Sequence, residues 1–228
     1  MEEFITRENQ IFEILQEFTR ASLNYILIGG YAVSAFKHRF SIDADVIIKK
    51  EDKQKFVFLL RKNKFVKAIG KTMPYVNFEQ FTKKEKLPIS VDLLIGGVAS
   101  RQTNAVWNFD FVLEHSIVKK IKGIEKEIKT RIPETELLIA TKLHSARLTD
   151  CRDIVALATK INKKKVVEYT LRGDKERLRR CLKKIEQTIE YKDFIDAFKG
   201  VFSIEAIPTK NVQRVKRITK ELQEKLSV

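Results

Sequence analysis

Apolar and polar residues alternate with two different periods along residues 1–132. Over residues 2–21 and 52–63 the apolar residues recur every three or four positions, which predicts two amphipathic helices. Elsewhere, short apolar runs stand between charged, glycine-containing or proline-containing turns, a pattern typical of β-strands. The predicted strands cover residues 25–28, 43–48, 65–69, 74–81 and 87–95, with one or two more between 109 and 132. Residues 31–37, between the first two strands, have helical character.

From residue 133 onward the pattern is helical. Pro133 is expected in the first turn of a helix, where its missing N–H is tolerated, and the glutamates after it suit the positive end of a helix dipole. Helices are also predicted over residues 166–191 and 191–201. Asn211 is expected to cap a last helix, which carries one apolar stripe as far as residue 226.

This change of pattern predicts an α+β protein with two domains. Residues 1–132 are expected to form a mixed β-sheet domain with flanking helices. Residues 133–228 are expected to form a C-terminal helical bundle. Of the 228 residues 43% are hydrophobic, which is enough for a sizeable core.

Other features of the composition predict a cytoplasmic location. No apolar run approaches the ~20 residues that a membrane span requires, and the acidic N-terminus lacks the pattern of a signal peptide. Cys151 and Cys181 have no metal-ligand spacing and are expected to be reduced thiols. We therefore expect a cytoplasmic protein with no membrane partner.

The net charge of +15 is unevenly distributed. From residue 160 to the C-terminus there are 19 Lys and Arg against 10 Asp and Glu. A basic surface attracts polyanions by electrostatic steering and counterion release. The basic C-terminal half is therefore expected to bind RNA or another polyanion. Lysine-rich helices that bind nothing are the alternative interpretation.

The candidate chemistry is concentrated in residues 25–49. Gly29 and Gly30 follow the first strand, and glycines let backbone N–H groups approach a phosphate closely. Asp43 and Asp45 open the second strand, where residues two apart point to the same face. Two carboxylates held together repel each other unless a cation lies between them or one takes a proton. Hard oxygen ligands favour Mg²⁺, which also binds substrate phosphates.

Asp92 supplies a third carboxylate. It lies within an otherwise apolar run, and burying a charge without a partner is costly. Beside Asp43 and Asp45 on a neighbouring strand it would complete a site for two Mg²⁺ ions, which can activate a hydroxyl and stabilise leaving pyrophosphate. A salt-bridged aspartate at a strand end is the alternative.

These motifs resemble those of the DNA polymerase β-like nucleotidyltransferase superfamily. The likeness consists of Gly29-Gly30, the stretch Arg39-Phe40-Ser41-Ile42-Asp43-Ala44-Asp45, and Val91-Asp92-Leu93. It implies Mg²⁺-dependent transfer of a nucleoside monophosphate from a nucleoside triphosphate (NTP) to a hydroxyl, with Asp43, Asp45 and Asp92 as catalytic metal ligands. It also implies nucleotide contacts from Gly29, Gly30, Arg39 and Ser41. Many members have Gly-Ser at the first motif, which affects the subfamily rather than the metal ligands.

Residues 133–157 extend the likeness toward the abortive-infection (AbiE-type) toxin nucleotidyltransferases, in which a Lys and a later Arg-Asp pair follow the catalytic strands. The resemblance implies that Lys142 reaches the triphosphate, that Asp153 lies close to the nucleotide, and that an antitoxin protein is a partner. An exposed helix lysine and an Arg–Asp pair that anchors the helices are the alternatives. His144 is expected to be a packed helix residue rather than a base, and Arg101 is a candidate phosphate or base contact.

Two other functions fit the same residues. An inactive relative could use the basic half to hold RNA or a partner protein. A small-molecule nucleotidyltransferase of the antibiotic-modifying kind is the other, although its acceptor cleft tends to be acidic. The acceptor is thus RNA, protein or a small molecule, and the positive charge favours a polyanion.

Overall fold

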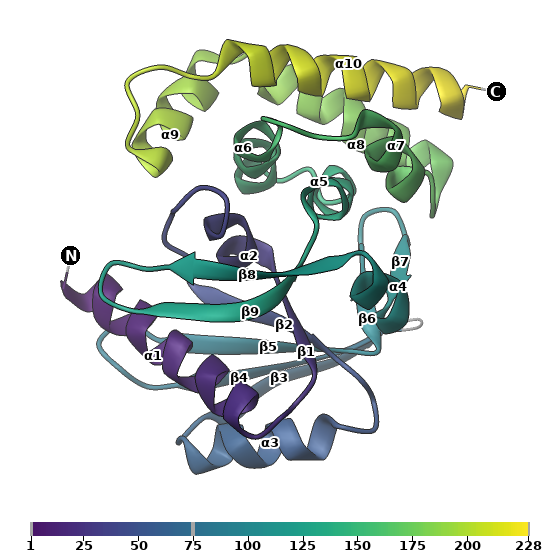
Figure 1. Cartoon of the computed structure of the whole chain (residues 1–228). Helices are drawn as coiled ribbons and strands as arrows, with labels where there is room; N and C mark the ends of the chain where they lie inside the picture. Colours follow the sequence, from purple (N-terminus) through teal and green to yellow (C-terminus); the bar gives the residue numbers. More distant parts are fainter. Residues whose placement is uncertain (1, 74–75, 228) are drawn as a thin grey trace. The chain divides into compact units, whose positions relative to one another are not determined.

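The computed structural model describes residues 2–73 and 76–227. The chain divides into two compact units (Figure 1). The first unit comprises Met1–Val98 and Trp107–Pro133, and the second comprises Ala99–Val106 and Glu134–Val228. No helix among the described residues is both long and apolar enough to cross a bilayer.

A five-stranded mixed sheet forms the centre of the first unit. Its strand order is β1-β2-β5-β4-β3; β2 and β5 pair in parallel, and the other pairs are antiparallel. The strands are β1 (Tyr25–Ile28), β2 (Asp43–Ile48), β3 (Val66–Met73), β4 (Val76–Lys83) and β5 (Ile89–Ile95). The strand predicted over residues 74–81 corresponds to β4, and Pro74 and Tyr75 lie outside the described residues.

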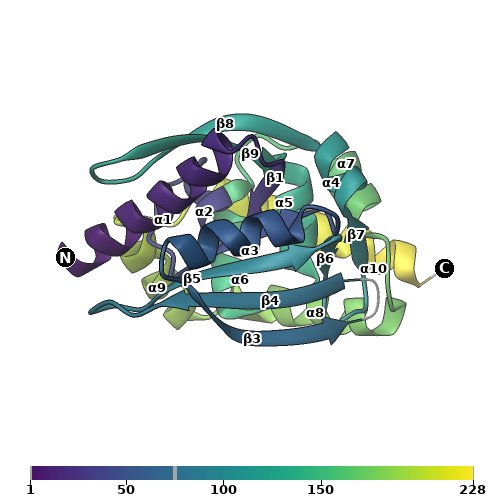
Figure 2. The ribbon, with the colours of Figure 1, turned by 90° about the horizontal axis from the view of Figure 1, so that it is seen from below.

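Two amphipathic helices cover one face of this sheet, as Figure 2 shows. They are α1 (Glu2–Arg20) and α3 (Lys53–Lys62), and both match the predicted periodic segments. The ring of Phe18 from α1 packs edge-on against Phe56 from α3, with centroids 4.9 Å apart, and against Tyr25 of β1 at 5.8 Å. Burial of these rings therefore joins both helices to the first strand.

The remaining elements of this unit lie near its motif residues and its C-terminal end. They are α2 (Gly29–Ser34), α4 (Phe109–Glu114), the antiparallel hairpin β8 (Ser116–Lys122) and β9 (Glu127–Pro133), and the short pair β6 (Gly97–Ala99) and β7 (Val106–Asn108). The last pair marks where the chain passes from the first unit to the second and back.

The strands predicted between residues 109 and 132 correspond to β8 and β9, but the helix α4 over residues 109–114 was not predicted. The Asn108 side chain accepts a hydrogen bond from Phe111 N at 2.8 Å and so caps this helix. Pro133 ends β9, opposite Ser116, rather than beginning a helix. Proline lacks the N–H that a strand donates to its neighbour, and at the end of a strand this loss costs few hydrogen bonds. The next helix begins at Thr135.

The described residues of the second unit form a bundle of six helices. They are α5 (Thr135–Leu143), α6 (Leu148–Leu157), α7 (Lys163–Thr170), α8 (Lys175–Thr188), α9 (Lys192–Phe202) and α10 (Thr209–Leu226). In Figure 1, α10 runs along α8, and its buried Val215, Ile218 and Leu222 form the predicted apolar stripe. The α+β fold class predicted from the sequence is confirmed.

Two predicted helix boundaries in this unit were wrong. The helix expected over residues 166–191 is broken at Gly173, whose φ of +73° favours glycine, and a Cβ there would collide with the backbone of Thr103. Asn211 lies inside α10 instead of capping it. Its amide donates to Val155 O of α6 at 2.9 Å and so holds the two helices together.

His144 follows α5 and is fully buried, which confirms its expected packed role. Its Nε2 donates to Thr170 O at 2.8 Å, so its Nδ1 accepts from the Thr103 hydroxyl at 2.6 Å. Burial lowers the pKa of His144 from 6.5 to about 4, although the hydrogen bond to Thr170 opposes this shift. The imidazole is therefore neutral in the folded protein at neutral pH.

This burial predicts a loss of stability in mild acid. Between pH 6.5 and about pH 4 the imidazole of His144 is protonated in the unfolded chain but stays neutral in the folded chain. The free energy of unfolding is therefore highest above pH 6.5 and decreases as the pH falls toward 4. We expect the free energy of unfolding to drop about 2 kcal/mol more for wild type than for His144→Asn between pH 7.5 and 5. Urea unfolding of both proteins at the two pH values measures these free energies. An equal decrease in wild type and in His144→Asn would contradict the prediction.

Candidate active site

Three carboxylates converge at the centre of the sheet in the first unit. Asp45 on β2 lies in register with Asp92 on the parallel neighbour β5, and Asp43 is two residues earlier on the same face of β2. One ligand oxygen from each lies within 4.8 Å of those of the other two. Asp92 is 6% exposed, whereas Asp43 and Asp45 are partly exposed. The structure thus brings together the three aspartates that the sequence singled out.

This arrangement fits a divalent cation. Three negative groups at this separation repel one another unless a cation or a proton lies among them. All the donors are hard carboxylate oxygens, the ligands that Mg²⁺ prefers. The donor set of Asp43, Asp45 and Asp92 therefore suits the predicted Mg²⁺ site.

Gln80 on β4 contributes a group that sequence analysis missed. It lies opposite Asp92 in the antiparallel β4–β5 register, and its side-chain amide donates to Asp92 Oδ1 at 3.0 Å. Such a bond orients a ligating carboxylate without neutralising it. The pairing of β4 with β5 creates this contact, so no local motif around Gln80 indicates it.

The Gly29-Gly30 pair lies directly beside the carboxylates. Gly29 adopts φ +72°, and a Cβ at this position would overlap the Asp45 carboxylate. A Cβ on Gly30 would overlap the Ser41 hydroxyl and would come within 2.9 Å of Arg39 Nη2. Both glycines are therefore required for the backbone after β1 to lie against the segment that leads into β2.

Ser41 and Arg39 are held in this segment by local hydrogen bonds. The Ser41 hydroxyl donates to Asp43 O at 3.4 Å, and Arg39 Nη1 donates to Phe40 O at 3.0 Å. Ser34, which sequence analysis did not select, donates to Arg39 O at 2.7 Å and connects α2 to the same segment. The structure therefore places the predicted nucleotide contacts of this unit around one carboxylate cluster.

Comparison with known proteins gives the fold a name. No protein-family model matches the sequence, and no curated protein matches it significantly. Among solved structures, the crystal structure of a candidate nucleotidyltransferase from H. pylori matches with a TM-score of 0.55 at 16% identity, covering 100% of this chain and 97% of that one. The protein has a nucleotidyltransferase fold.

Two further nucleotidyltransferases are more distant. The lincosamide antibiotic adenylyltransferase LnuA, with lincomycin bound, has a TM-score of 0.46 at 20% identity, over 67% of this chain and 96% of that one. The antibiotic-resistance factor ANT(2'')-Ia has a TM-score of 0.40 at 14% identity, over 87% and 92%. Both scores lie below 0.5, so neither likeness indicates a substrate.

Replacement of glycine by alanine should change the stability of the protein in opposite directions at Gly29 and at Gly200. Gly29→Ala should lower the free energy of unfolding by about 1–2 kcal/mol, because alanine is strained at positive φ and its Cβ displaces the carboxylate. Gly200→Ala, in α9 with nothing within 4 Å of the added Cβ, should raise it by about 0.5–1 kcal/mol. Urea denaturation of both variants checks this, and a neutral Gly29→Ala would refute the predicted clash.

Lys142 and Asp153 belong to the second unit and form a buried ion cluster there. Lys142 Nζ lies 2.7 Å from Asp153 Oδ2 and 3.2 Å from Asp150 Oδ1, and all three side chains are at most 8% exposed. Asp150 also accepts from Arg147 Nε at 2.8 Å. Lys142 is thus not the exposed helix lysine considered above, and its ammonium has carboxylate partners in the bundle. Its predicted contact with the triphosphate stays a prediction.

Asp150 is the member of this cluster that sequence analysis missed. Burial alone would raise its pKa, but the Lys142 charge and the Arg147 hydrogen bond outweigh burial and lower the pKa from 3.8 to about 2. The available signal was its spacing from Asp153, since residues three apart on a helix share a face. Both carboxylates are therefore directed toward Lys142.

Proposed function

We propose that this protein is a Mg²⁺-dependent nucleotidyltransferase that moves a nucleoside monophosphate from an NTP to a hydroxyl acceptor. The single observation that carries the proposal is the convergence of Asp43, Asp45 and Asp92 on two adjacent parallel strands. The nucleotidyltransferase fold and the two glycines beside the carboxylates support it. Mutual repulsion among three carboxylates destabilises the folded protein unless a cation lies among them, so a function that requires a bound cation accounts for their convergence.

The proposed roles follow from the position of each residue. Asp43, Asp45 and Asp92 would hold the metal, whose chemistry when bound is to neutralise phosphate charge and to favour deprotonation of the attacking hydroxyl. Asp92, which Gln80 orients, would also accept the proton of that hydroxyl. Catalysis would then rest on positioning and electrostatic stabilisation, as is usual for phosphoryl-group chemistry.

The backbone around the glycine pair would receive the nucleotide. Gly29 and Gly30 leave no side chain between their peptide groups and the carboxylates, so a triphosphate bound to the metal could approach these amides. Arg39 brings a guanidinium and Ser41 a hydroxyl to the same place, and both groups donate hydrogen bonds to phosphate oxygens. These contacts would fix the NTP before the acceptor arrives.

We propose RNA as the acceptor because residues 160–228, less than a third of the chain, carry most of its excess positive charge, 19 Lys and Arg against 10 Asp and Glu. Membership of the AbiE type, a toxin role and an antitoxin partner rest on the motif from Lys142 to Asp153 and stay proposals. A protein or small-molecule acceptor is an alternative outcome of the same experiment.

Label transfer tests the function directly. The purified chain is incubated with Mg²⁺ and each α-³²P-labelled NTP in turn, together with total RNA and total cell protein, with and without EDTA. We expect EDTA-sensitive label in RNA from one preferred NTP. Label in protein would identify protein nucleotidylylation, and bound NTP without transfer would favour a small-molecule acceptor. Absence of both NTP binding and transfer would refute the proposed activity.

A further inference from the structure

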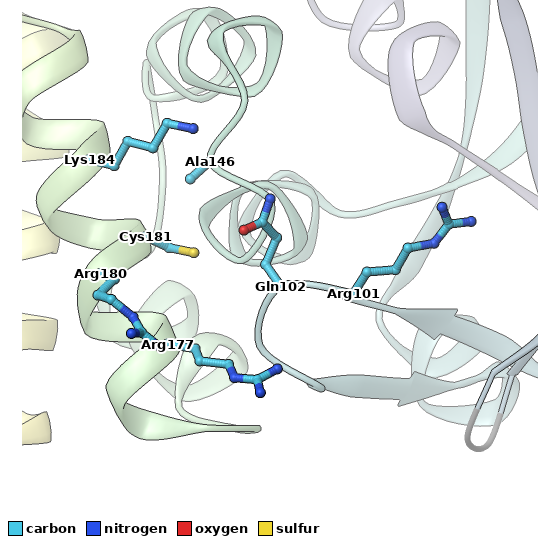
Figure 3. Close-up of a pocket in the computed structure, with 7 residues that line it drawn as sticks. All are labelled: Arg101, Gln102, Ala146, Arg177, Arg180, Cys181 and Lys184. Atoms are coloured by element: carbon cyan, nitrogen blue, oxygen red, sulfur yellow. The ribbon is translucent and has the colours of Figure 1, made fainter.

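The second unit contains a concave site lined mainly by cationic and polar residues. The pocket has a volume of about 570 Å³. Arg177, Arg180 and Lys184 of α8 form one wall, and Arg101 and Gln102 belong to the opposite wall (Figure 3). Ala146 and Cys181 complete the lining, which contains no carboxylate. The site is separate from the carboxylate cluster in sequence and in composition.

Helix α8 places its cations along this pocket by simple periodicity. Positions 177, 180 and 184 are three and four residues apart and so share one face of the helix. The opposite face buries Leu178, Leu182 and Ile185 in the bundle. The whole helix carries six Lys and Arg but only two Glu. Packing of its apolar face therefore directs the basic face outward to the pocket.

Two of the three cations on the α8 wall have no carboxylate partner among the described residues. Arg177 Nε lies 3.5 Å from Asp174, the residue that caps α8. Among the described residues, Arg180 and Lys184 form no ion pair with a carboxylate, and both are exposed. An anion at this wall would therefore meet two cations that need not first release an internal partner.

The distribution of the charges favours a chain of phosphates over a single phosphate. From residue 177 to 184 the helix rises about 10 Å, so its cations are spread over a length greater than that of one phosphate group. In Figure 3 the Arg101 side chain extends away from α8, and Lys184 reaches toward Ala146, so the positive groups do not converge on one point. Gln102 adds an amide that can hydrogen-bond a base edge or a 2′-hydroxyl.

We propose that this pocket binds the phosphodiester backbone of RNA. It would thereby provide the binding site for the acceptor, a role that rests on the proposed function, whereas RNA binding itself does not require transfer. RNA is favoured over a small polyphosphate because net positive charge continues along the chain from residue 160 to the C-terminus, well beyond the pocket.

Fluorescence anisotropy with a fluorescein-labelled oligouridylate of ~20 nucleotides tests the proposal on the full chain. R180A/K184A removes two pocket cations. K175A/K183A removes the same charge from exposed positions of α8 that do not line the pocket. We expect the Kd to rise about tenfold or more for the pocket variant and less than about threefold for the control, and the salt slope to fall by about 1.4 for the pocket variant only.

Each other outcome overturns the proposal. Equal weakening by both variants would mean diffuse charge attraction, and displacement of RNA by stoichiometric tripolyphosphate would mean a small polyphosphate ligand. Absence of RNA binding by wild type would also refute it.

R180Q/K184Q, which keeps long side chains, replaces the alanine pair if that variant unfolds. Asp45→Asn should bind RNA like wild type, so loss of transfer and loss of RNA binding are distinguishable.

Discussion

Asp45→Asn is expected to reduce label transfer by about a thousandfold or more. Asp45 lies between the other two ligands, in register with Asp92 and two residues after Asp43. The amide removes one negative charge from a set whose oxygens lie within 4.8 Å of one another. Because metal-based charge stabilisation contributes several kcal/mol and each ~1.4 kcal/mol is tenfold in rate, partial loss of the metal suffices for this effect.

The matched control is Asp110→Asn on α4. This substitution makes the same chemical change at an exposed residue, whose carboxylate lies 3.5 Å from the ammonium of Lys49. An exposed ion pair of this kind contributes little to stability. Its transfer rate should equal that of wild type. A comparable loss in both variants would show that the assay reports general damage rather than the carboxylate site.

Metal-linked stability gives a readout that does not depend on activity. The proposed binding of Mg²⁺ to the folded protein should raise the Tm of wild type. Asp45→Asn should show little or no rise, and in EDTA it should be at least as stable as wild type because one mutual repulsion is gone. An unchanged Mg²⁺ response in the variant would remove Asp45 from the metal site, and full transfer activity would refute the assignment.

The sequence predicted the central strands of the first unit and the convergence of their aspartates, because these features depend on short-range patterns. A period of two on β2 places Asp43 and Asp45 on one face, and the isolated charge at Asp92 marks the adjacent strand. Gly29 is conspicuous for a local reason too, since only glycine adopts its φ of +72° without strain. Backbone rules that act over a few residues thus suffice to find these positions.

The parts that the sequence did not predict depend on partners far along the chain. Gln80 gains its role from the register of β4 against β5, and the break at Gly173 is fixed by the approach of Thr103. Asn211 is of a residue type that often caps helices, but its side-chain amide instead donates a hydrogen bond to Val155 O in another helix. Local propensity gave way in these cases to tertiary contacts that periodicity does not encode.

Lys142→Met is expected to destabilise the helical bundle by about 3–5 kcal/mol. Methionine keeps most of the side-chain volume but leaves Asp150 and Asp153 buried without their shared cation. The control Lys216→Met removes a lysine from an exposed pair with Glu190, at 2.7 Å in the same unit, and should cost less than about 1 kcal/mol. Urea unfolding followed by far-UV circular dichroism at pH 7 compares the two.

The pH dependence identifies the charge as the cause. In wild type the pKa of Asp150 is lowered to about 2, so its stabilisation is fully present above pH 4 and is lost as the pH falls toward 2. Without Lys142, protonation of the buried Asp150 carboxylate relieves part of the unpaired charge, so the difference between variant and wild type should shrink as the pH falls. A pH-independent difference would point to packing rather than charge.

The same variant separates a structural Lys142 from one that binds the triphosphate. If the ion cluster only holds the bundle, the folded fraction of Lys142→Met should transfer label with an unchanged KM for the NTP, since the ammonium would then act only on Asp150 and Asp153. A large loss of stability with normal KM therefore supports the structural role. A stable variant with a KM raised tenfold or more, about 1.4 kcal/mol of lost binding, would instead place Lys142 at the nucleotide.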